Sequence, residues 1–457
     1  MRSLEDLFLT RRDLLRLGVV SSAGYPFLPL ATTRLKAAGN ANPRGSARFC
    51  IFVMLQGGQS HVDAWDLKEG PWTPPDFDVR TIGPGIQWPM SLYPKMAVRL
   101  DKFTLVRSLE SREDQHGPGQ YHLQTAHRHD AAPVAEIPPI GAVVASEFAA
   151  RRRPTDSLPP YVAFNTFPHM GLIGPGFLPA AYGPFHINTA SDLSALAPPE
   201  EARHQWQRRR DLPQRFDGRL RTDPSLEKEM YRDYSNCYEG ALSRLPDRRN
   251  AAIFNLPAAE RERYGKTATG DAFLLARNLV AAAAGTHFIF LTQEGWDHHA
   301  GIYSEKNHYR LSRELDLCLS NLLDDLEGSK RPDGSSVLDE TLVIAMGEFG
   351  RTPGALTNIG GRDHFPQAFT GCFAGGGIKP GQIVGKTGEQ GARIVDHGWS
   401  QGRSVYMEDI AATIYSAMGI DWTKRIQATP SGHVFEYVER SSPTQVPASH
   451  EVSELFG

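Results

Sequence analysis

The chain has 457 residues, with 49 Lys and Arg against 52 Asp and Glu, a formal net charge of −3 and a hydrophobic fraction of 40%. This composition excludes a disordered chain, and the near-neutral charge argues against a nucleic-acid binder, which usually carries a basic face. Its four cysteines are far apart and form no C-x-x-C pair, which excludes a disulfide scaffold and a structural zinc ribbon.

The N-terminal segment is typical of an export signal. Arg11 and Arg12 precede two leucines and Arg16, and a mildly apolar run at 17–30 and a zone of small residues follow. The arginine pair indicates twin-arginine export, so we assign residues 1–41 to a signal and expect a periplasmic or secreted protein. The alternative for this segment is an amphipathic surface helix. No later segment reaches about 18 consecutive apolar residues, so we expect no transmembrane segment in the mature chain.

Apolar segments along the rest of the chain predict strands separated by helices. The first, 47–55, is continuously apolar, which is typical of a buried parallel strand. Further strands are expected at 103–107, 161–164, 287–291 and 341–346, and helices at 271–284 and 311–326. Strands joined by helices of this length predict an α/β fold with a mostly parallel sheet that helices cover on both faces.

One α/β domain at 45–440 accounts best for this pattern. The segment at 198–263 is much more charged than its surroundings, and we expect it to be a peripheral helical insertion. Residues 441–457 then form a C-terminal tail.

Polar loops follow the predicted strands at the edge where open α/β sheets bind ligands. Five of these loops, at 56–66, 111–119, 295–299, 347–353 and 361–364, carry histidine, aspartate or glutamate. Imidazole and carboxylate groups suit Zn²⁺, Mn²⁺ or similar ions, so the coincidence of positions favours a divalent-metal site. Each loop alone is explained as well by a hydrogen-bonded loop anchor. No nucleophile elbow, Walker loop or dinucleotide fingerprint is present.

The same segments resemble a known family. Residues 56–66, 295–299, 347–353 and 361–364 are similar to the family catalogued as domain of unknown function 1501, and the resemblance covers nearly all of 45–440. That family is placed in the alkaline-phosphatase-like superfamily, beside sulfatases and cofactor-independent phosphoglycerate mutases. The resemblance implies a three-layer α/β/α fold and one or two divalent metals, most simply Zn or Mn, that clamp a phosphate or sulfate ester.

The resemblance also implies roles for individual residues. Asp297 and His299 resemble the pair that opens the metal set, Glu348 stands where relatives carry Asp-His, and His364 resembles a late histidine ligand. Asp63 or His61 would supply an early ligand. The metal residues implied in this way are His61, Asp63, Asp297, His299, Glu348, Asp363 and His364.

The chain departs from relatives at the nucleophile. The corresponding position falls within 114–119, which contains no Ser, Thr or Cys, and no formylglycine signature is present. This argues against the usual covalent sulfatase route. It leaves His116 as nucleophile or metal ligand, or direct attack on the ester by a metal-bound hydroxide. Arg351 and Arg362 either bind a phosphate bidentately or hydrogen-bond loop carbonyls. The candidate catalytic residues are therefore His116, Arg351 and Arg362.

Two functions of different classes follow. The first is an exported, metal-dependent hydrolase of a phosphate or related sulfate-type ester, with a small anionic ester as substrate and no nucleic-acid partner. The alternative is a family member that has lost the nucleophile and binds a ligand or a protein partner without turnover.

Overall fold

A computed structural model describes residues 41–83, 85–129, 134–166, 171–190, 248–427, 429–439 and 448–457. The predicted export signal, except for residue 41, lies outside the described residues, and so does the predicted insertion up to residue 247. The described end of that insertion contains two short helices, α8 (Arg248–Phe254) and α9 (Ala258–Arg263).

The core of the described region is an eight-stranded sheet. Its strands lie in the order β12 (Ile383–Val384), β4 (Phe103–Leu109), β11 (Phe369–Ala374), β8 (Thr341–Met346), β1 (Phe49–Leu55), β7 (Phe288–Gln293), β5 (Tyr161–Phe164) and β6 (Phe185–Ile187). All neighbours pair in parallel except β11, which runs antiparallel to both β4 and β8. The sheet is therefore mostly parallel, as predicted.

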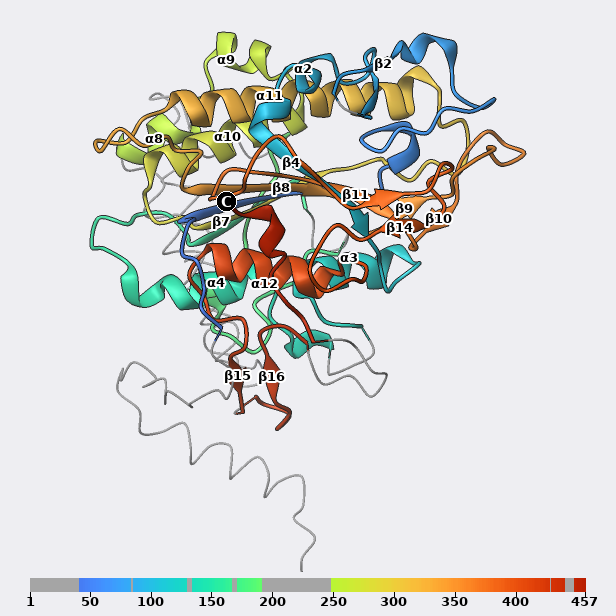
Figure 1. The fold of residues 1–457 in the computed structure, drawn as a ribbon. Coiled ribbons are helices and arrows are strands. Elements are labelled where there is room, and N and C mark those ends of the chain that lie inside the picture. The colour runs from blue at the N-terminus through green and yellow to red at the C-terminus, as the bar shows by residue number, and fades with distance from the viewer. Residues whose placement is uncertain are drawn as a thin grey trace, which may run out of the picture. The chain divides into compact units, whose positions relative to one another are not determined.

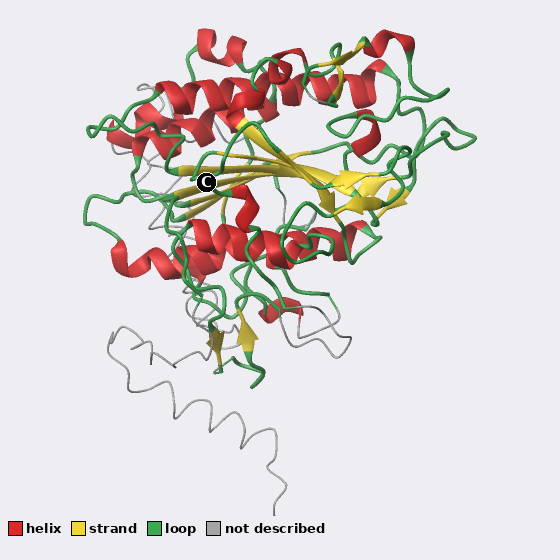
Figure 2. Ribbon diagram, in the orientation of Figure 1, coloured by secondary structure: helices red, strands yellow, loops and turns green. Residues whose placement is uncertain are grey.

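Helices cover both faces of this sheet (Figures 1 and 2). One layer contains α10 (Ala268–Ala282) and α11 (Arg310–Gly328), and the short α2 (Pro94–Ala97) lies against α11. The other layer contains α3 (His116–Thr125), α4 (Ile140–Phe148) and α12 (Met407–Ala417). The prediction of a three-layer α/β/α fold is confirmed.

The central strand β1 shows why its sequence is apolar throughout. Ile51 and Val53 belong to the core that also contains the buried side chains of α10 and α11. Phe52 and Met54 point the other way, into the core that contains those of α4 and α12. Because successive side chains of a strand alternate between faces, a strand covered on both sides is apolar at every position.

All five predicted strands are present, as β1, β4, β5, β7 and β8. The sequence prediction missed β6, β11 and β12. Both β6 and β12 are too short for a periodic signal, and β11 contains Gly371, which weakens strand propensity.

Short elements complete the described region. Two-stranded sheets pair β2 (Val79–Thr81) with β3 (Gln87–Pro89), β9 (Gly350–Arg351) with β10 (His364–Phe365), β13 (Lys386–Thr387) with β14 (Ile394–Asp396), and β15 (Arg425–Ile426) with β16 (Phe435–Glu436). Single turns of helix are η2 (His61–Asp63), η3 (Pro75–Phe77), η4 (Leu100–Lys102), η5 (Val134–Glu136), η6 (Ala149–Arg151), η8 (Ala180–Tyr182), η10 (Glu305–Tyr309) and η11 (Ser453–Leu455).

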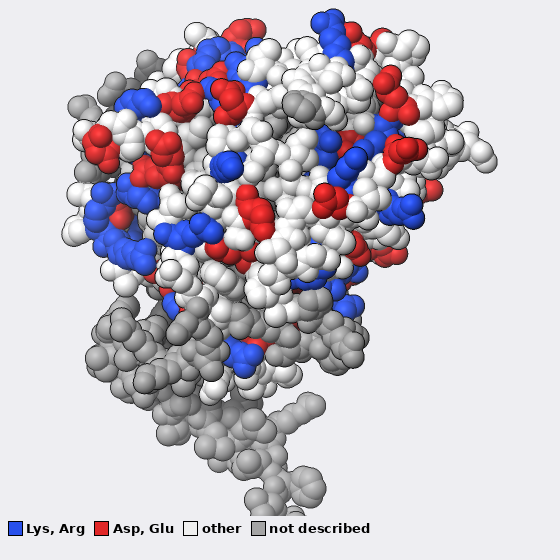
Figure 3. Space-filling model, in the orientation of Figure 1, with Lys and Arg blue, Asp and Glu red and all other residues white. Residues whose placement is uncertain are grey.

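The helices and the surface charges of the described region have two further properties. In the described part of the chain, no helix combines the length and the apolar character that crossing a bilayer requires. On the face shown in Figure 3, acidic and basic side chains are interspersed.

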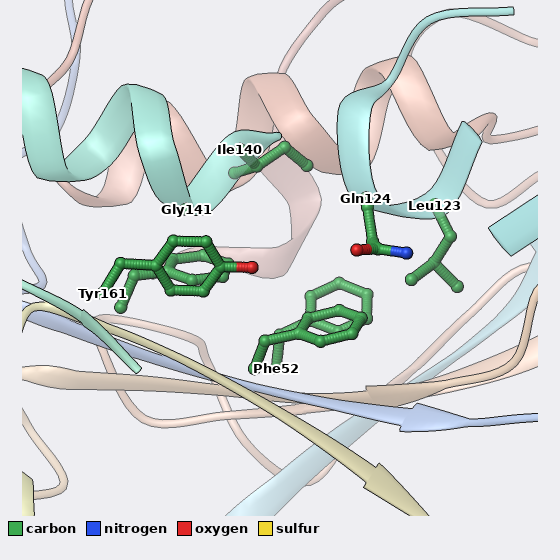
Figure 4. Close-up of a pocket in the computed structure, with 8 residues that line it drawn as sticks. Phe52, Leu123, Gln124, Ile140, Gly141 and Tyr161 are labelled. Carbon is green, nitrogen blue, oxygen red and sulfur yellow. The ribbon is translucent and has the colours of Figure 1, made fainter. Parts of the chain in front are cut away.

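Helix α4 packs closely on the sheet at Gly141. Figure 4 shows Gly141 and Ile140 facing Tyr161 and Phe52 across a small recess, with Leu123 and Gln124 of α3 beside them. A Cβ atom at position 141 would lie 2.6 Å from Cδ1 of Phe288 and 2.7 Å from Cζ of Tyr161. Only glycine permits this approach of helix and strands.

We expect Gly141→Ala to destabilise the protein by about 1–3 kcal/mol, the usual cost of overpacking a filled core. Both neighbouring rings are buried in the sheet, so α4 or the strands must move to admit the methyl group. Gly174→Ala is the matched control, because a Cβ atom there meets nothing within 4 Å. Urea unfolding measures the difference, and equal free energies of unfolding for the two variants would contradict the prediction.

Candidate metal centre

Four side chains converge at the carboxyl edge of the sheet. His116 begins α3 after β4, Asp297 and His299 follow β7, and His364 lies in β10, beyond the end of β8. One ligand atom from each of these residues lies within 4.8 Å of the others. These four residues are called the His–Asp cluster below. In Figure 1, α3, β9 and β10 lie at the same end of the sheet.

The cluster has a carboxylate surrounded by three imidazoles. Oδ1 of Asp297 is 3.2 Å from Nε2 of His116, 3.0 Å from Nε2 of His299 and 3.6 Å from Nε2 of His364. The Nε2 atoms of His299 and His364 are 3.1 Å apart. All three histidines thus direct the same ring nitrogen towards one point.

The other ring nitrogen of each histidine is held by an acceptor. Nδ1 of His116 donates to Oε1 of Glu348 at 2.8 Å. Nδ1 of His299 donates to Oδ1 of Asp363 at 2.8 Å, and Nδ1 of His364 donates to the carbonyl of Asp114 at 2.6 Å. These bonds place the ring proton on Nδ1 and leave the lone pair of Nε2 directed into the cluster, the arrangement that metal-binding histidines adopt.

The donor set fits a divalent cation. Nε2 of His116 is buried and has no hydrogen-bond partner. Three imidazoles and one carboxylate match the ligands that Zn²⁺ takes, and they also suit Mn²⁺. A cation at this point would give Nε2 of His116 a partner. It would also lie between the Nε2 atoms of His299 and His364, which otherwise face each other.

Neighbouring charges keep Asp297 ionised. Partial burial would raise the pKa of this carboxyl, but the hydrogen bond and charge of Arg351, together with His116 and His299, lower its pKa to about 2. The pKa of His116 is raised above its ordinary value, because the hydrogen bond and charge of Glu348 outweigh the effect of burial. Burial is the main cause that lowers the pKa of His364.

Arg351 holds the cluster carboxylate in place. Its guanidinium is fully buried, and Nη2 donates to Oδ1 of Asp297 at 2.5 Å and to the carbonyl of Gly57. Nε donates to the carbonyl of Gly58 at 3.2 Å, and Nη1 donates to the carbonyl of Arg362 at 3.0 Å. The fork of Arg351 is therefore occupied by protein acceptors.

The loop after β1 supports the same carboxylate and Glu348. Gly57 has φ +107°, and a Cβ atom there would lie 2.4 Å from the backbone nitrogen of Asp297. Glycine therefore allows the two loops to touch. The N–H of Gly57 donates to the buried carboxylate of Glu348, at 3.0 Å from Oε1 and 3.2 Å from Oε2.

Arg362 and Asp63 form a separate buried ion pair. Nε of Arg362 lies 2.6 Å from Oδ2 of Asp63, and Nη2 lies 3.1 Å from Oδ1. Nη1 donates to the carbonyls of Thr352 and Gly354 at 2.7 and 2.8 Å. The hydroxyl of Tyr303 donates to Oδ1 of Asp63 at 2.8 Å. This pair ties η2 to the loop that precedes His364.

The structure brings together some of the sequence-predicted site residues and separates others. His116, Asp297, His299 and His364 converge, and Glu348 and Asp363 contact the cluster through histidine Nδ1 atoms. His61 does not reach the cluster, because its Nε2 is bound to the carbonyl of Gly391 at 3.0 Å and its ring stacks on Phe365. Asp63 and Arg362 are taken up by their mutual ion pair.

Sequence reasoning missed two supports of the cluster. One is the carbonyl of Asp114, which has no side-chain signal in a sequence. The other is Gln120, whose Nε2 is 3.3 Å from Oε1 of Glu348. Gln120 lies four residues after His116 in α3, and residues at i and i+4 share one helix face, but no helix is predicted there from the sequence, so this spacing gave no signal.

Fold and site together define a three-layer α/β protein with a candidate centre for one divalent metal at the carboxyl edge of its sheet. The model of the family described as "Protein of unknown function (DUF1501)" matches residues 47–445, and the chain belongs to this family. Among curated proteins, none matches the chain.

Solved structures with distant similarity include three bacterial proteins. A protein in the alkaline phosphatase superfamily from Vibrio parahaemolyticus is 11% identical, with 91% of this chain and 76% of that chain covered and a TM-score of 0.39. The lipoteichoic acid synthase LtaP from Listeria monocytogenes is 11% identical, with 83% and 74% covered and a TM-score of 0.36. A phosphonate monoester hydrolase from Silicibacter pomeroyi is 12% identical, with 82% and 74% covered and a TM-score of 0.37.

Proposed function

We propose that this protein is a metal-dependent hydrolase of phosphate or related sulfate-type esters, with one divalent ion held by His116, Asp297, His299 and His364. The observation that carries the proposal is the convergence of three Nε2 atoms on one carboxylate, each with its Nδ1 held by an acceptor. When bound, such an ion supplies Lewis-acid polarisation of an ester oxygen and lowers the pKa of water.

The ligand types favour zinc over the other candidate metals. Mg²⁺ and Ca²⁺ prefer oxygen ligands, whereas three imidazoles and a carboxylate are a common set for Zn²⁺. Manganese is the second candidate. The described donors converge on one point, so the proposal specifies one ion.

His116 is assigned the role of ligand and not of nucleophile. Its Nδ1 is bonded to Glu348, and its Nε2 faces Asp297 at 3.2 Å. A nitrogen that points to a cation cannot also attack an ester. The proposal therefore has water attack the ester directly, with no covalent enzyme intermediate.

The chain's own groups make the site accessible and favourable for an anion. The side chains of Asp297 and His299 are 44% and 43% exposed, so an ester can approach from solvent. Helix α3 begins at His116, so the partial positive charge of its N-terminus lies at the cluster. Arg351 keeps Asp297 oriented while the ester binds.

The proposed hydrolase would act outside the cytoplasm on a small substrate. Residues 1–41 would direct the folded chain through twin-arginine export to the periplasm or the exterior, and the substrate would be a small anionic ester.

Metal content and turnover of the full-length protein, purified from its own host, test the proposal. Mass spectrometry is expected to find about one zinc or manganese ion per chain in the parent and far less in His364→Ala. His433→Ala is the matched control, because this exposed histidine lies outside the cluster. The loaded protein should hydrolyse 4-nitrophenyl esters, and a chelator should abolish turnover. A parent without metal overturns the metal centre. Bound metal without turnover of any ester overturns the hydrolase and leaves a binding protein.

A further inference from the structure

Three carboxylates surround the candidate metal position. Asp297 is a member of the cluster, and Glu348 and Asp363 each lie 2.8 Å from Nδ1 of a cluster histidine. Glu348 accepts hydrogen bonds from His116, from the N–H of Gly57 and from Gln120.

Two buried arginines near these carboxylates are already engaged. Arg351 donates to Asp297 and to three backbone carbonyls. Arg362 donates to Asp63, to Tyr303 and to two carbonyls. Neither guanidinium therefore offers a fork to a substrate oxyanion, which is the usual way that arginine recognises phosphate. In the part of the chain that the structure describes, no other Lys or Arg forms an ion pair with a member of the His–Asp cluster.

These groups set the formal charge of the loaded centre. A divalent ion and Arg351 together balance the carboxylates of Asp297, Glu348 and Asp363, and the three histidines are neutral when they are ligands. A phosphate monoester carries a charge of about −1.5 to −2 at pH 7. In the described part of the chain, its second negative charge would meet the three carboxylates, and the guanidinium groups of Arg351 and Arg362 are already engaged. An ester with one negative charge avoids that repulsion.

We infer that this site acts on esters whose acid group carries a single negative charge, that is, a phosphodiester or a sulfate monoester, in preference to a phosphate monoester. The inference rests on the proposed hydrolase function. In the reaction, the oxygen of water forms a new bond to phosphorus or sulfur and the bond from that atom to the ester oxygen breaks. One proton of water ends on the leaving alcohol. The other proton stays with the product, or is released to solvent where the product acid ionises.

Substituting Asp363 changes the charge of the centre without removing a proposed metal ligand. Its side chain is 60% exposed, and it contacts the centre only through Nδ1 of His299. Asp363→Asn keeps an oxygen that accepts this hydrogen bond and removes one negative charge. The preference for singly charged esters should therefore weaken in this variant while the ligand set remains.

The test compares substrates and ligands of different charge on the metal-loaded, full-length protein. Values of kcat/KM are measured for bis(4-nitrophenyl) phosphate, 4-nitrophenyl sulfate and 4-nitrophenyl phosphate, and the first two distinguish the phosphodiester from the sulfate. Calorimetry gives the Kd of dimethyl phosphate and of methylphosphonate at a pH where the latter is dianionic. The parent is expected to prefer a singly charged ester by at least about tenfold in kcat/KM.

The second part of the test repeats these measurements on Asp363→Asn. In Asp363→Asn, both the kcat/KM ratio and the Kd ratio are expected to shift by about threefold to tenfold towards the doubly charged compound. Glu327→Gln also removes one negative charge, but Glu327 lies at the C-terminal end of α11 and outside the His–Asp cluster, so this control should shift neither ratio. A parent that prefers 4-nitrophenyl phosphate, or ratios that Asp363→Asn does not move, overturn the inference and leave the hydrolase intact. A loaded protein that hydrolyses none of the three esters overturns the proposed function itself.

Discussion

Replacing Glu348 with glutamine is expected to weaken zinc binding by about tenfold to a hundredfold, the usual effect of altering a carboxylate that supports a histidine ligand. The carboxylate fixes the proton of His116 on Nδ1 and so directs the lone pair of Nε2 into the His–Asp cluster. The same fully buried carboxylate accepts a hydrogen bond from the N–H of Gly57. In glutamine an NH₂ group replaces Oε2, which lies 3.2 Å from the N–H of Gly57, so two donors would face each other. The side chain must turn to avoid this, and the ring of His116 then loses its fixed orientation.

Competition with a chromophoric chelator measures the zinc Kd of the parent and of the variant. Glu327→Gln is the matched control, because this glutamate is 52% exposed and lies on α11. Thermal unfolding without metal separates a change in the site from a loss of fold. A Glu348→Gln protein that folds and keeps the zinc Kd of the parent would show that Glu348 does not support the metal centre.

Breaking the buried pair between Asp63 and Arg362 is expected to cost about 3–5 kcal/mol of folding free energy. Both side chains are at most 1% exposed, so Asp63→Leu leaves a guanidinium in the interior without its carboxylate partner. The pKa of Asp63 is lowered from its ordinary value, because the charge of Arg362 outweighs the effect of burial, and the pair is therefore ionised at neutral pH. Loss of the ion pair should also make the segment that contains Asp363 and His364 more mobile, because Arg362 anchors that segment.

Urea unfolding of Asp63→Leu, Arg362→Leu and the double variant tests this expectation. The double variant should be more stable than either single variant, because it removes both charges together. It should not reach the stability of the parent, since the carbonyls of Thr352 and Gly354 lose their donor. A single variant that loses less than about 1 kcal/mol would contradict the assignment of a buried, paired charge.

Local sequence patterns predicted the layers of the fold well and its details less well. The apolar runs that became β1, β4, β5, β7 and β8 are buried on both faces, and burial on both faces leaves a signal in every residue of a strand. The apolar run of β11 is interrupted by Thr370 and Gly371, so its signal was weaker. Its antiparallel direction depends on pairing with β4 and β8 rather than on its own residues.

Polar loops with histidine and carboxylate groups could be expected at one edge of the sheet from local patterns alone, since a parallel sheet brings the carboxyl ends of its strands together. Which of those groups meet could not be predicted in this way. His116, Asp297, His299 and His364 converge, whereas His61 turns to the carbonyl of Gly391 and Asp63 pairs with Arg362. The reason is that these contacts join positions up to about 330 residues apart, and the distance between such positions depends on loop conformation and packing that no local pattern contains.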